Sequence, residues 1–333
     1  MLSFTSNDPD NDKAIAHGFD NKECMGEPKF TVYFKPEYYA DPEISSSEPK
    51  ALLRTEQFRI QEEFSLSTRE YEILVDLVSR GEPVPEDSGR GFKRAYLAIQ
   101  KVMHHKLKNE LEFGPDEKVF LKPVYDSTKP RTNHICTLFA SSGAGKSWKV
   151  NDLLMRNPCV LNNICPGIFL FSSVGDNDPS YKPIKDFYQF KFFWKDPRDL
   201  DPEDTQIRTY EERSILIFDD INSISDRRVR EKVIHFRETC LEIARHRSLG
   251  IISTEHLFHN RAKTQKLRNS SAYLCLYPRN SPKPIDDVLE NNFNLNRFER
   301  NSLIKKCKRE GRANFIHVDY PGYLVNTKRV HLF

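Results

Sequence analysis

The stretch Ile135-Cys-Thr-Leu-Phe-Ala140-Ser-Ser-Gly-Ala-Gly-Lys-Ser147 joins a short apolar run to a glycine-rich turn. Its spacing matches a phosphate-binding loop between a buried strand and a helix, with Ala140 where the first glycine usually stands. Gly143 and Gly145 allow the backbone to curl so that successive N–H groups point at phosphates. Lys146 is expected to reach the β- and γ-phosphates of ATP, and the Ser147 hydroxyl to bind Mg²⁺. The predicted nucleotide contacts are Ser141, Ser142, Gly143, Ala144, Gly145, Lys146 and Ser147.

Beyond this loop the chain alternates between strand and helix patterns. Apolar runs of strand length occur at 135–140, 167–173, 214–219, 250–254 and 273–277. They are continuous rather than alternating, which is typical of parallel strands buried on both faces. A helix is predicted over 226–247, with Val229, Val233, Phe236 and Cys240 on one face. The pattern predicts an α/β fold, a mostly parallel sheet flanked by helices.

Two further strand ends carry polar residues. The run 214–218 delivers Asp219 and Asp220, and we expect Asp219 to hold Mg²⁺ and Asp220 to activate water. The alternative is a helix-capping turn with two solvated aspartates. The run 250–254 ends at Thr254 and Glu255, either of which could sense the γ-phosphate by a hydrogen bond to the attacking water. An ordinary strand end explains this second pattern equally well.

The first 130 residues follow a different pattern. Residues 1–28 are polar, rich in Asn and Asp and without a period, which predicts a mobile segment. A strand is expected at 29–34, a helix capped by Ser67 and Glu70, and a second helix over about 91–111. Residues 127–132 read as a linker. We therefore predict a mixed α+β extension over 1–130 and a nucleotide-binding domain over 131–333.

Charge is distributed unevenly along the chain. Residues 1–50 carry five basic and ten acidic side chains, whereas residues 297–333 carry nine basic and three acidic ones. A helix from about residue 296 to before Gly311 is followed by terminal strands. Its Lys305, Lys306, Lys308 and Arg309 are candidate contacts to DNA phosphates. A solvated basic surface without a partner is the competing interpretation.

Composition bounds the class of protein. With 38% hydrophobic and 30% charged residues in 333, the chain can form a sizeable core in a soluble protein. The seven cysteines include no C-x-x-C pair, no apolar run is long enough to cross a membrane, and the N-terminus lacks a secretion signal. These features favour an intracellular protein with reduced thiols.

The stretches Glu242-Ile-Ala-Arg245-His246-Arg-Ser-Leu-Gly-Ile-Ile-Ser-Thr254-Glu-His256 and Arg268-Asn269-Ser-Ser-Ala-Tyr-Leu-Cys-Leu-Tyr-Pro278-Arg279 are more specific. They resemble the genome-packaging ATPases of poxviruses and nucleocytoplasmic giant viruses, in the FtsK–HerA superfamily of P-loop NTPases. The resemblance covers residues 131 to about 300. The chain departs from the family pattern at Ala244, where Gly is usual, at Glu255, where an amide or small hydroxyl is common, and at Asp220, where the superfamily has Glu.

The resemblance implies a RecA/FtsK–HerA-like motor that uses ATP and Mg²⁺ to move double-stranded DNA, as a homo-oligomeric ring. Its partners would be DNA and capsid or portal-vertex proteins, in the host cytoplasm or nucleus or in the virion. Arg245 matches the family's arginine before His and is the candidate finger for a neighbour's site, with Arg247 as the second choice. The alternative role of Arg245 is to stabilise the end of a helix.

Three other interpretations remain open. A cellular-type DNA pump or helicase of the same superfamily shares nearly all these features. A nucleotide-gated DNA-binding assembly factor with little turnover would keep Lys146, and the residues at 220 and 255 favour it slightly. A small-metabolite kinase would need an arginine-rich lid between Asp219 and Arg245, where one continuous helix fits better.

Overall fold

The structure is a computed structural model of the 333-residue chain. It describes residues 2–4, 6, 12–22, 24, 27–34, 57–80, 82–85, 88–114, 116–129, 132–155, 157–174, 178–256, 261–278, 282–310, 313–319 and 322–333. Within these ranges the side chains at 58–59, 79–80, 100–109, 261–263 and 309–310 are not described.

A ten-stranded sheet forms the centre of the molecule, in the order β4-β14-β13-β12-β11-β6-β10-β9-β7-β8. Its parallel part comprises β11 (Tyr273–Leu276), β6 (Ile135–Phe139), β10 (Gly250–Glu255), β9 (Ile215–Asp219), β7 (Ile168–Phe171) and β8 (Phe192–Lys195). The antiparallel part comprises β12 (Asn314–His317), β13 (Tyr323–Val325), β14 (Arg329–Leu332) and β4 (Glu110–Glu112). All five predicted strands are present and parallel, so the mostly parallel α/β fold is confirmed.

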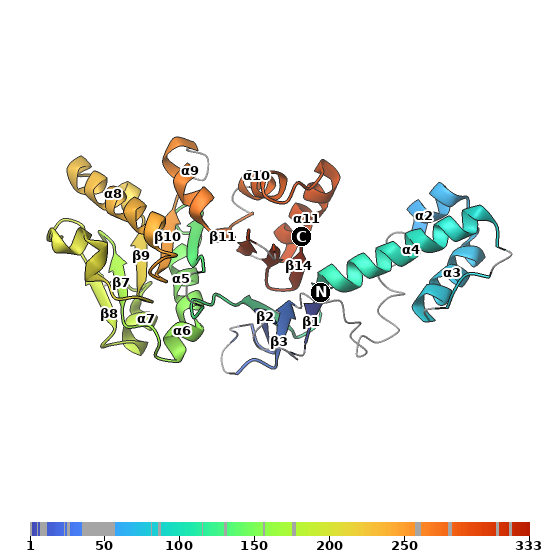
Figure 1. The fold of residues 1–333 in the computed structure, drawn as a ribbon, viewed down its shortest axis with the longest axis horizontal. Coiled ribbons are helices and arrows are strands. Elements are labelled where there is room, and N and C mark those ends of the chain that lie inside the picture. The colour runs from blue at the N-terminus through green and yellow to red at the C-terminus, as the bar shows by residue number, and fades with distance from the viewer. Residues whose placement is uncertain are drawn as a thin grey trace.

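Helices cover both faces of this sheet (Figure 1). One face carries α5 (Lys146–Met155), α6 (Pro158–Leu161) and α7 (Lys182–Phe187). The other carries α8 (Arg227–Ile243), α9 (Arg261–Ser270), α10 (Lys283–Asn291) and α11 (Arg297–Glu310). Short 3-10 helices lie at η1 (Glu203–Thr205), η2 (Ile207–Thr209) and η3 (Ile221–Ser223). The result is a three-layer sandwich.

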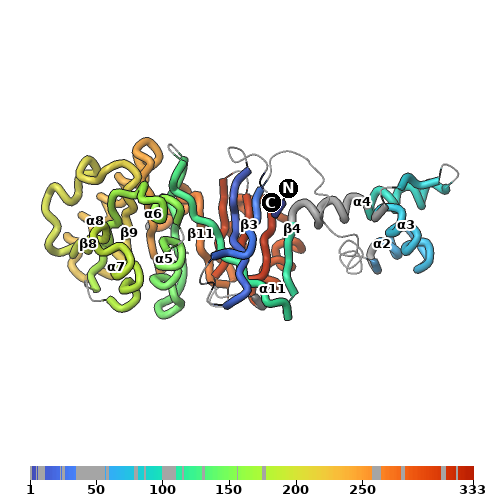
Figure 2. The backbone as a smooth tube through the Cα atoms, turned by 90° about the horizontal axis from the view of Figure 1, so that it is seen from below, coloured from blue at the N-terminus to red at the C-terminus, as the bar shows by residue number. Residues whose placement is uncertain are grey.

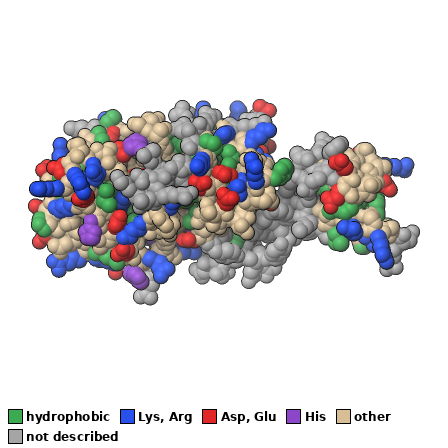
Figure 3. Space-filling view, turned by 90° about the horizontal axis from the view of Figure 1, so that it is seen from above, with side chains coloured by type: hydrophobic (Ala, Val, Ile, Leu, Met, Phe, Trp, Pro, Cys, Tyr) green, Lys and Arg blue, Asp and Glu red, His purple; other side chains and the backbone are tan. Residues whose placement is uncertain are grey.

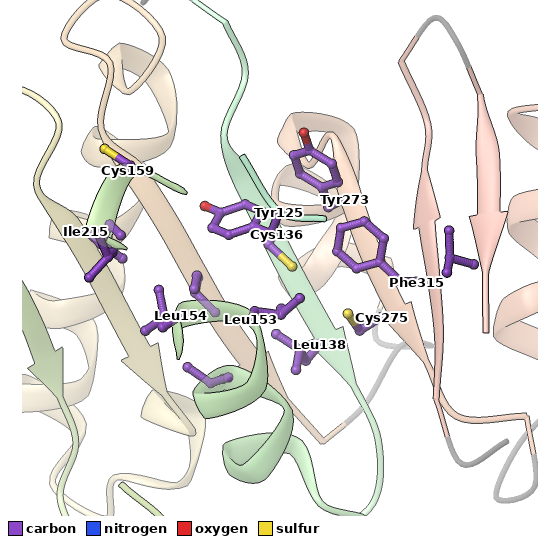
Figure 4. Packing of buried hydrophobic residues seen from close by; sticks show 14 of the residues in the cluster. Tyr125, Cys136, Leu138, Leu153, Leu154, Cys159, Ile215, Tyr273, Cys275 and Phe315 are labelled. Atoms are coloured by element: carbon purple, nitrogen blue, oxygen red, sulfur yellow. The ribbon is translucent and has the colours of Figure 1, made fainter. Parts of the chain in front are cut away.

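The helix after the loop is held by apolar packing. Leu153 and Leu154 of α5 belong to the same buried cluster as Leu138 of β6 and Ile215 of β9 (Figure 4). Fully burying such a side chain contributes about 1.5–3 kcal/mol. This packing fixes the helix whose first residue is Lys146.

A smaller antiparallel sheet packs on the α5 face, against the antiparallel strands. Its order is β1 (Leu2–Ser3), β3 (Phe30–Phe34), β2 (Lys13–Phe19) and β5 (Phe120–Pro123). The expectation of a mobile segment over 1–28 is wrong for Lys13–Phe19, which form a central strand. One of its two partner strands, β5, lies about a hundred residues later, and this long-range pairing leaves no local signal in the sequence.

Three N-terminal helices have a core of their own (Figure 2). They are α2 (Gln57–Phe64), α3 (Thr68–Arg80) and α4 (Arg90–Asn109), packed around a separate buried cluster. The capping pattern is confirmed, since the Glu70 N–H donates to Ser67 Oγ and the Ser67 N–H donates to Glu70 Oε2. The domain division after residue 130 stays a prediction. Residues 130 and 131 lie outside the described ranges, and β4 of the N-terminal part joins the large sheet.

Helix α8 ends earlier than the sequence indicated. Asp226 caps its start by accepting hydrogen bonds from the N–H groups of Arg228 and Val229. The helix stops at Ile243 rather than near Arg247, and the chain then turns through 244–249, where Ser248 has a left-handed φ of 54°. This backbone conformation is incompatible with continuing the helix.

All seven cysteines are buried. Among the helices that the structure describes, none is both long enough and apolar enough to cross a bilayer.

Lys13 is a polar contact between the two sheets. Its Nζ lies 3.1 Å from His317 Nε2 on β12. The same ammonium lies 5.9 Å from the ring centre of Tyr273 and 5.5 Å from that of Tyr323. A lysine thus stands among aromatic rings at the sheet–sheet interface.

We expect Lys13→Met to change how stability depends on pH. Burial and the charge of Lys129 lower the pKa of Lys13 to about 8, while Asp319 and Asp126 oppose the shift. Between about 8 and 10.5 the unfolded chain binds more protons, so the Lys13 contribution to stability rises with pH. The melting temperature of Lys13→Met relative to the parent should therefore fall as the pH rises through this range. A shift of 1 kcal/mol corresponds to about 2–4 °C. A difference in melting temperature that is constant with pH would contradict this assignment.

Candidate active site

The glycine-rich loop lies between β6 and α5, as the sequence predicted. Gly143 and Gly145 have φ values of 71° and 95°, in the left-handed region that favours glycine. Ser141, Ser142 and both glycines are exposed, and α5 begins at Lys146. The positive end of α5 and the exposed loop backbone therefore face the place where phosphates would bind.

Lys146 lies within this loop with its ammonium group directed inward. Its Nζ donates to the carbonyl oxygens of Ala140, at 2.9 Å, and Ser141, at 3.2 Å. Its third short contact is to His256 Nδ1, at 3.2 Å. The ammonium is thus held at the base of the loop by three polar atoms.

Carboxylates surround the same lysine. Burial lowers the pKa of Lys146, and the negative charges of Asp220, Asp219 and Glu255 oppose this shift. The structure therefore brings the predicted phosphate-loop lysine and the predicted acid pair into one site.

Strand β10 lies between the loop strand β6 and the acid strand β9. Thr254 stands opposite Asp219 in register and donates from Oγ1 to Asp219 Oδ1, at 2.5 Å. The same hydroxyl accepts from the Asp220 N–H, at 3.0 Å. Thr254 therefore fixes the positions of both acids.

Asp219 and Ser147 fit a magnesium site. Burial raises the pKa of Asp219, the charges of Asp220 and Asp178 add to the shift, and Thr254 and Tyr181 oppose it. A bound dication would favour the ionised carboxylate.

The buried Tyr181 hydroxyl lies near both Ser147 and Asp219, but its geometry does not meet the criteria for a hydrogen bond to either. Ser147 and Asp219 thus share one neighbour, and hydroxyl and carboxylate oxygens are ligands that Mg²⁺ prefers. No group of three His, Cys, Asp or Glu side chains forms a metal site among the described residues. Magnesium sites of this kind usually take their remaining ligands from water and phosphate oxygens.

Asp220 has an unusual backbone conformation and a buried carboxylate oxygen without a hydrogen-bond partner among the described residues. Its φ of 50° is left-handed, at the start of η3. Its Oδ2 lies 2.6 Å from His256 Nε2, whereas its Oδ1 is buried and has no hydrogen-bond partner among the described residues. That oxygen can accept a proton from water.

Glu255 is held by the protein. Its carboxylate pairs with the buried Arg237 of α8 and accepts from Asn222 Nδ2, at 2.5 Å. The side chains of Glu255 and Arg237 are 3% and 2% exposed. Of the two candidate sensors, Thr254 contacts the acid pair, while the Glu255 carboxylate is already occupied.

The candidate arginine fingers lie away from this site. Arg245 is exposed in the turn before β10, and β10 runs parallel to β6. The start of β10 therefore lies at the opposite sheet edge from the loop of its own chain. Arg247 donates hydrogen bonds to the carbonyl oxygens of Ile207 and Tyr210, so its guanidinium stabilises the fold.

Four residues near the site were not identified from the sequence: Asp178, Tyr181, Arg237 and His256. His256 belongs to the Thr-Glu-His stretch that carries the family resemblance, so the sequence did contain a signal for its place near the site. Arg237 interrupts the apolar stripe of α8, and a charged residue on a buried face indicates a buried partner. Tyr181 and Asp178 carry no comparable local signal.

Helix α11 is present with the apolar face that the sequence indicated, since Leu303, Ile304 and Cys307 are buried. Lys305 and Lys308 are exposed. Lys306 lies 3.2 Å from Glu110 and 3.9 Å from Glu112 of β4.

The Arg309 side chain lies outside the described residues, as does Arg279. On the face drawn in Figure 3, basic and acidic side chains are interspersed. The DNA contacts therefore stay predictions.

No protein-family model and no curated protein matches the chain. Among solved structures it is similar to the DNA-packaging ATPase of Sulfolobus turreted icosahedral virus, with 12% identity, a TM-score of 0.38, and coverage of 61% of this chain and 97% of that one. It is also similar to the pCW3 conjugation coupling protein TcpA, with 13% identity, a TM-score of 0.37, and coverage of 71% and 79%. Thermomonospora curvata EccC gives 11% identity, a TM-score of 0.35, and coverage of 73% and 47%.

Proposed function

We propose that this chain is an ATP-driven double-stranded DNA translocase that packages a viral genome. The hydrolytic part rests on one observation: Thr254 holds Asp219 and Asp220 together, and the charges of these two acids act on Lys146. The DNA-packaging part is supported by the family resemblance of 242–256 and 268–279.

In the proposed reaction the oxygen of water forms a bond to the γ-phosphorus of ATP. The bond from that phosphorus to the bridging oxygen breaks, and ADP leaves with the electron pair. The water proton passes to Asp220, whose Oδ1 has no hydrogen-bond partner among the described residues. Lys146 gives up at least one of its three present partners to contact the phosphates, and Thr254 keeps the acids in place. Bound Mg²⁺, held by Ser147 and Asp219, would neutralise phosphate charge.

We further propose that the active form is a ring of identical subunits. Arg245 lies at the sheet edge opposite its own loop, so it can complete only a neighbour's site. The proposed partners are double-stranded DNA and capsid or portal-vertex proteins. The proposed location is the host cytoplasm or nucleus, or the virion.

Turnover of radiolabelled ATP with and without long duplex DNA tests this function. A DNA translocase should hydrolyse ATP faster when DNA is present. Binding of ATP without turnover would instead identify a nucleotide-gated factor. Phosphoryl transfer to a small molecule, indifferent to DNA, would identify a kinase.

The nucleotide-gated factor is the second candidate. Asp220 has a shorter side chain than the usual Glu, and one of its carboxylate oxygens is hydrogen-bonded to His256. The Lys146 ammonium is held by three polar atoms. Both features are compatible with slow turnover. The same ATP measurement decides between the two.

For the DNA surface we predict that Lys305→Gln together with Lys308→Gln weakens binding to all sequences alike. The reason is that phosphate contacts carry no base information. The slope of log affinity against log salt should flatten by nearly one unit, roughly 0.9, for each phosphate that the variant no longer neutralises. Lys306→Gln alone should have a smaller effect, because Lys306 already pairs with Glu110.

The matched control neutralises Arg208 and Arg227, two exposed arginines away from α11. Fluorescence anisotropy with two unrelated duplexes across a salt series makes the measurement. If the Lys305/Lys308 variant and this control behave alike, the basic face of α11 is a solvated surface.

A further inference from the structure

His256 connects the loop lysine to the second acid. Its Nδ1 lies 3.2 Å from Lys146 Nζ, and its Nε2 lies 2.6 Å from Asp220 Oδ2. An ammonium group can only donate hydrogen bonds, so Nδ1 must accept and is unprotonated. The ring proton then sits on Nε2 and is donated to the carboxylate. A single neutral tautomer of His256 therefore satisfies both contacts.

All three donors of Lys146 have partners in this arrangement. Two of them go to the carbonyl oxygens of Ala140 and Ser141, and the third goes to His256. An ammonium has three N–H bonds, so Lys146 can contact phosphate only by giving up at least one partner. His256 and the phosphates of a nucleotide therefore compete for the same donor group.

Asp220 is held through one carboxylate oxygen, and its other carboxylate oxygen is buried. Its N–H is held by Thr254 and its Oδ2 by His256, while its Oδ1 has no hydrogen-bond partner among the described residues. With one oxygen held, the carboxylate cannot rotate freely, and the second oxygen keeps a defined direction. His256 therefore aims the oxygen that would receive the proton from water.

We propose that His256 is a positioning residue with two separable functions at this site. Through Nδ1 it holds Lys146 in a resting position until phosphates displace it. Through Nε2 it keeps Asp220 aimed at the attacking water. The second function rests on the proposed hydrolysis, whereas the first requires only that nucleotide binds here. The two side chains are partly exposed, 34% for His256 and 26% for Asp220, so substitutions at 256 should not disturb the core.

Two amides separate these functions. In His256→Gln the amide nitrogen reaches about as far as Nε2, so donation to Asp220 is kept and the acceptor for Lys146 is removed. In His256→Asn the amide oxygen stands near the place of Nδ1, so the acceptor is kept and the hydrogen bond to Asp220 is removed. His256→Ala removes both.

We expect kcat to fall by about 10- to 100-fold in the Asn and Ala variants, as when outer-shell partners are removed, and to stay near parental in Gln. The order of the variants in nucleotide affinity should differ from their order in kcat. The Gln and Ala variants should bind a non-hydrolysable ATP analogue with Mg²⁺ about two- to tenfold more tightly, which is the worth of one competing hydrogen bond. Asn should bind it like the parent. A merely structural defect would weaken both properties together.

Steady-state turnover and titration calorimetry with that analogue measure the two properties. His235→Ala, at an exposed position of α8, is the matched control and should change neither. Equal kcat in the Gln and Ala variants would overturn the role of His256 in positioning Asp220. Equal affinities in all four proteins would overturn its competition for Lys146. If the parent binds the analogue but does not hydrolyse ATP, the proposed hydrolysis fails together with the Asp220 function, and the affinity order still decides the Lys146 function.

Discussion

Replacing Lys146 with Ala should reduce ATP turnover by about 100- to 1000-fold, the loss typical when a preorganised donor to the transition state is removed. The reason is that Lys146 is the cation at the base of the loop that can reach the β- and γ-phosphates. Stability should be nearly unchanged. Burial lowers the pKa of Lys146, which means that the fold already disfavours its charge. Turnover is measured with radiolabelled ATP and stability by thermal melting.

Two companion variants sharpen this result. Asp219→Asn should lose the Mg²⁺-dependent part of turnover, since Asp219 is the acid beside Ser147. Lys29→Ala removes an exposed lysine just before β3 and should have no effect on turnover. If Lys146→Ala and Asp219→Asn both hydrolyse ATP at the parental rate, the assignment of the active site is wrong.

The second large effect is expected at Arg245. An arginine supplied by a neighbouring subunit can raise the rate by roughly 10³- to 10⁵-fold, because it stabilises charge on the phosphoryl group in transfer. Arg245 is exposed and lies at the sheet edge opposite its own loop. We therefore expect Arg245→Ala to lose DNA-stimulated turnover while keeping nucleotide affinity.

Mixing inactive subunits tests whether Arg245 acts between subunits. In an equal mixture of Arg245→Ala and Lys146→Ala chains, about a quarter of the interfaces in a ring unite an intact lysine with an intact arginine. Turnover should recover toward about that fraction of the parental value. Arg208→Ala is the exposed control and should stay active. Full activity of Arg245→Ala on its own would show that Arg245 only stabilises the end of α8.

The parallel strands could be predicted because burial on both faces leaves a local signature. Ile215–Asp219 is a continuous buried run, and its predicted limits differ from the observed ones by a single residue. The loop was equally local, since its strand, glycines, lysine and helix are contiguous. Such features need no knowledge of distant residues.

Features that depend on distant partners could not be predicted. Strand β2 pairs with β5, about a hundred residues away. The bulky run at 190–194 reads as core by composition, yet Phe190 is 91% and Phe193 43% exposed. Phe190 lies in the turn before β8, and β8 itself lies at the edge of the large sheet. Composition records hydrophobicity but not a strand's place in the sheet.

The site was only partly predictable for a related reason. Thr254 and Glu255 are adjacent in sequence, but successive side chains of a strand point to opposite faces. Thr254 contacts Asp219, whereas Glu255 pairs with Arg237 of α8. From the sequence alone both Thr254 and Glu255 are candidate sensors, because the sequence does not show which face of β10 carries the side chain that contacts the acids of β9.

Displacement of a triplex-forming strand from long duplex DNA tests the central claim most directly. A translocase that uses Lys146 should remove the third strand when ATP and Mg²⁺ are supplied. It should fail with a non-hydrolysable analogue, and the Lys146→Ala protein should fail with ATP. Displacement should also be delayed in proportion to the distance between the loading end and the triplex. ATP hydrolysis without any displacement, or displacement by Lys146→Ala at the parental rate, would contradict the account of this protein as an ATP-driven DNA motor.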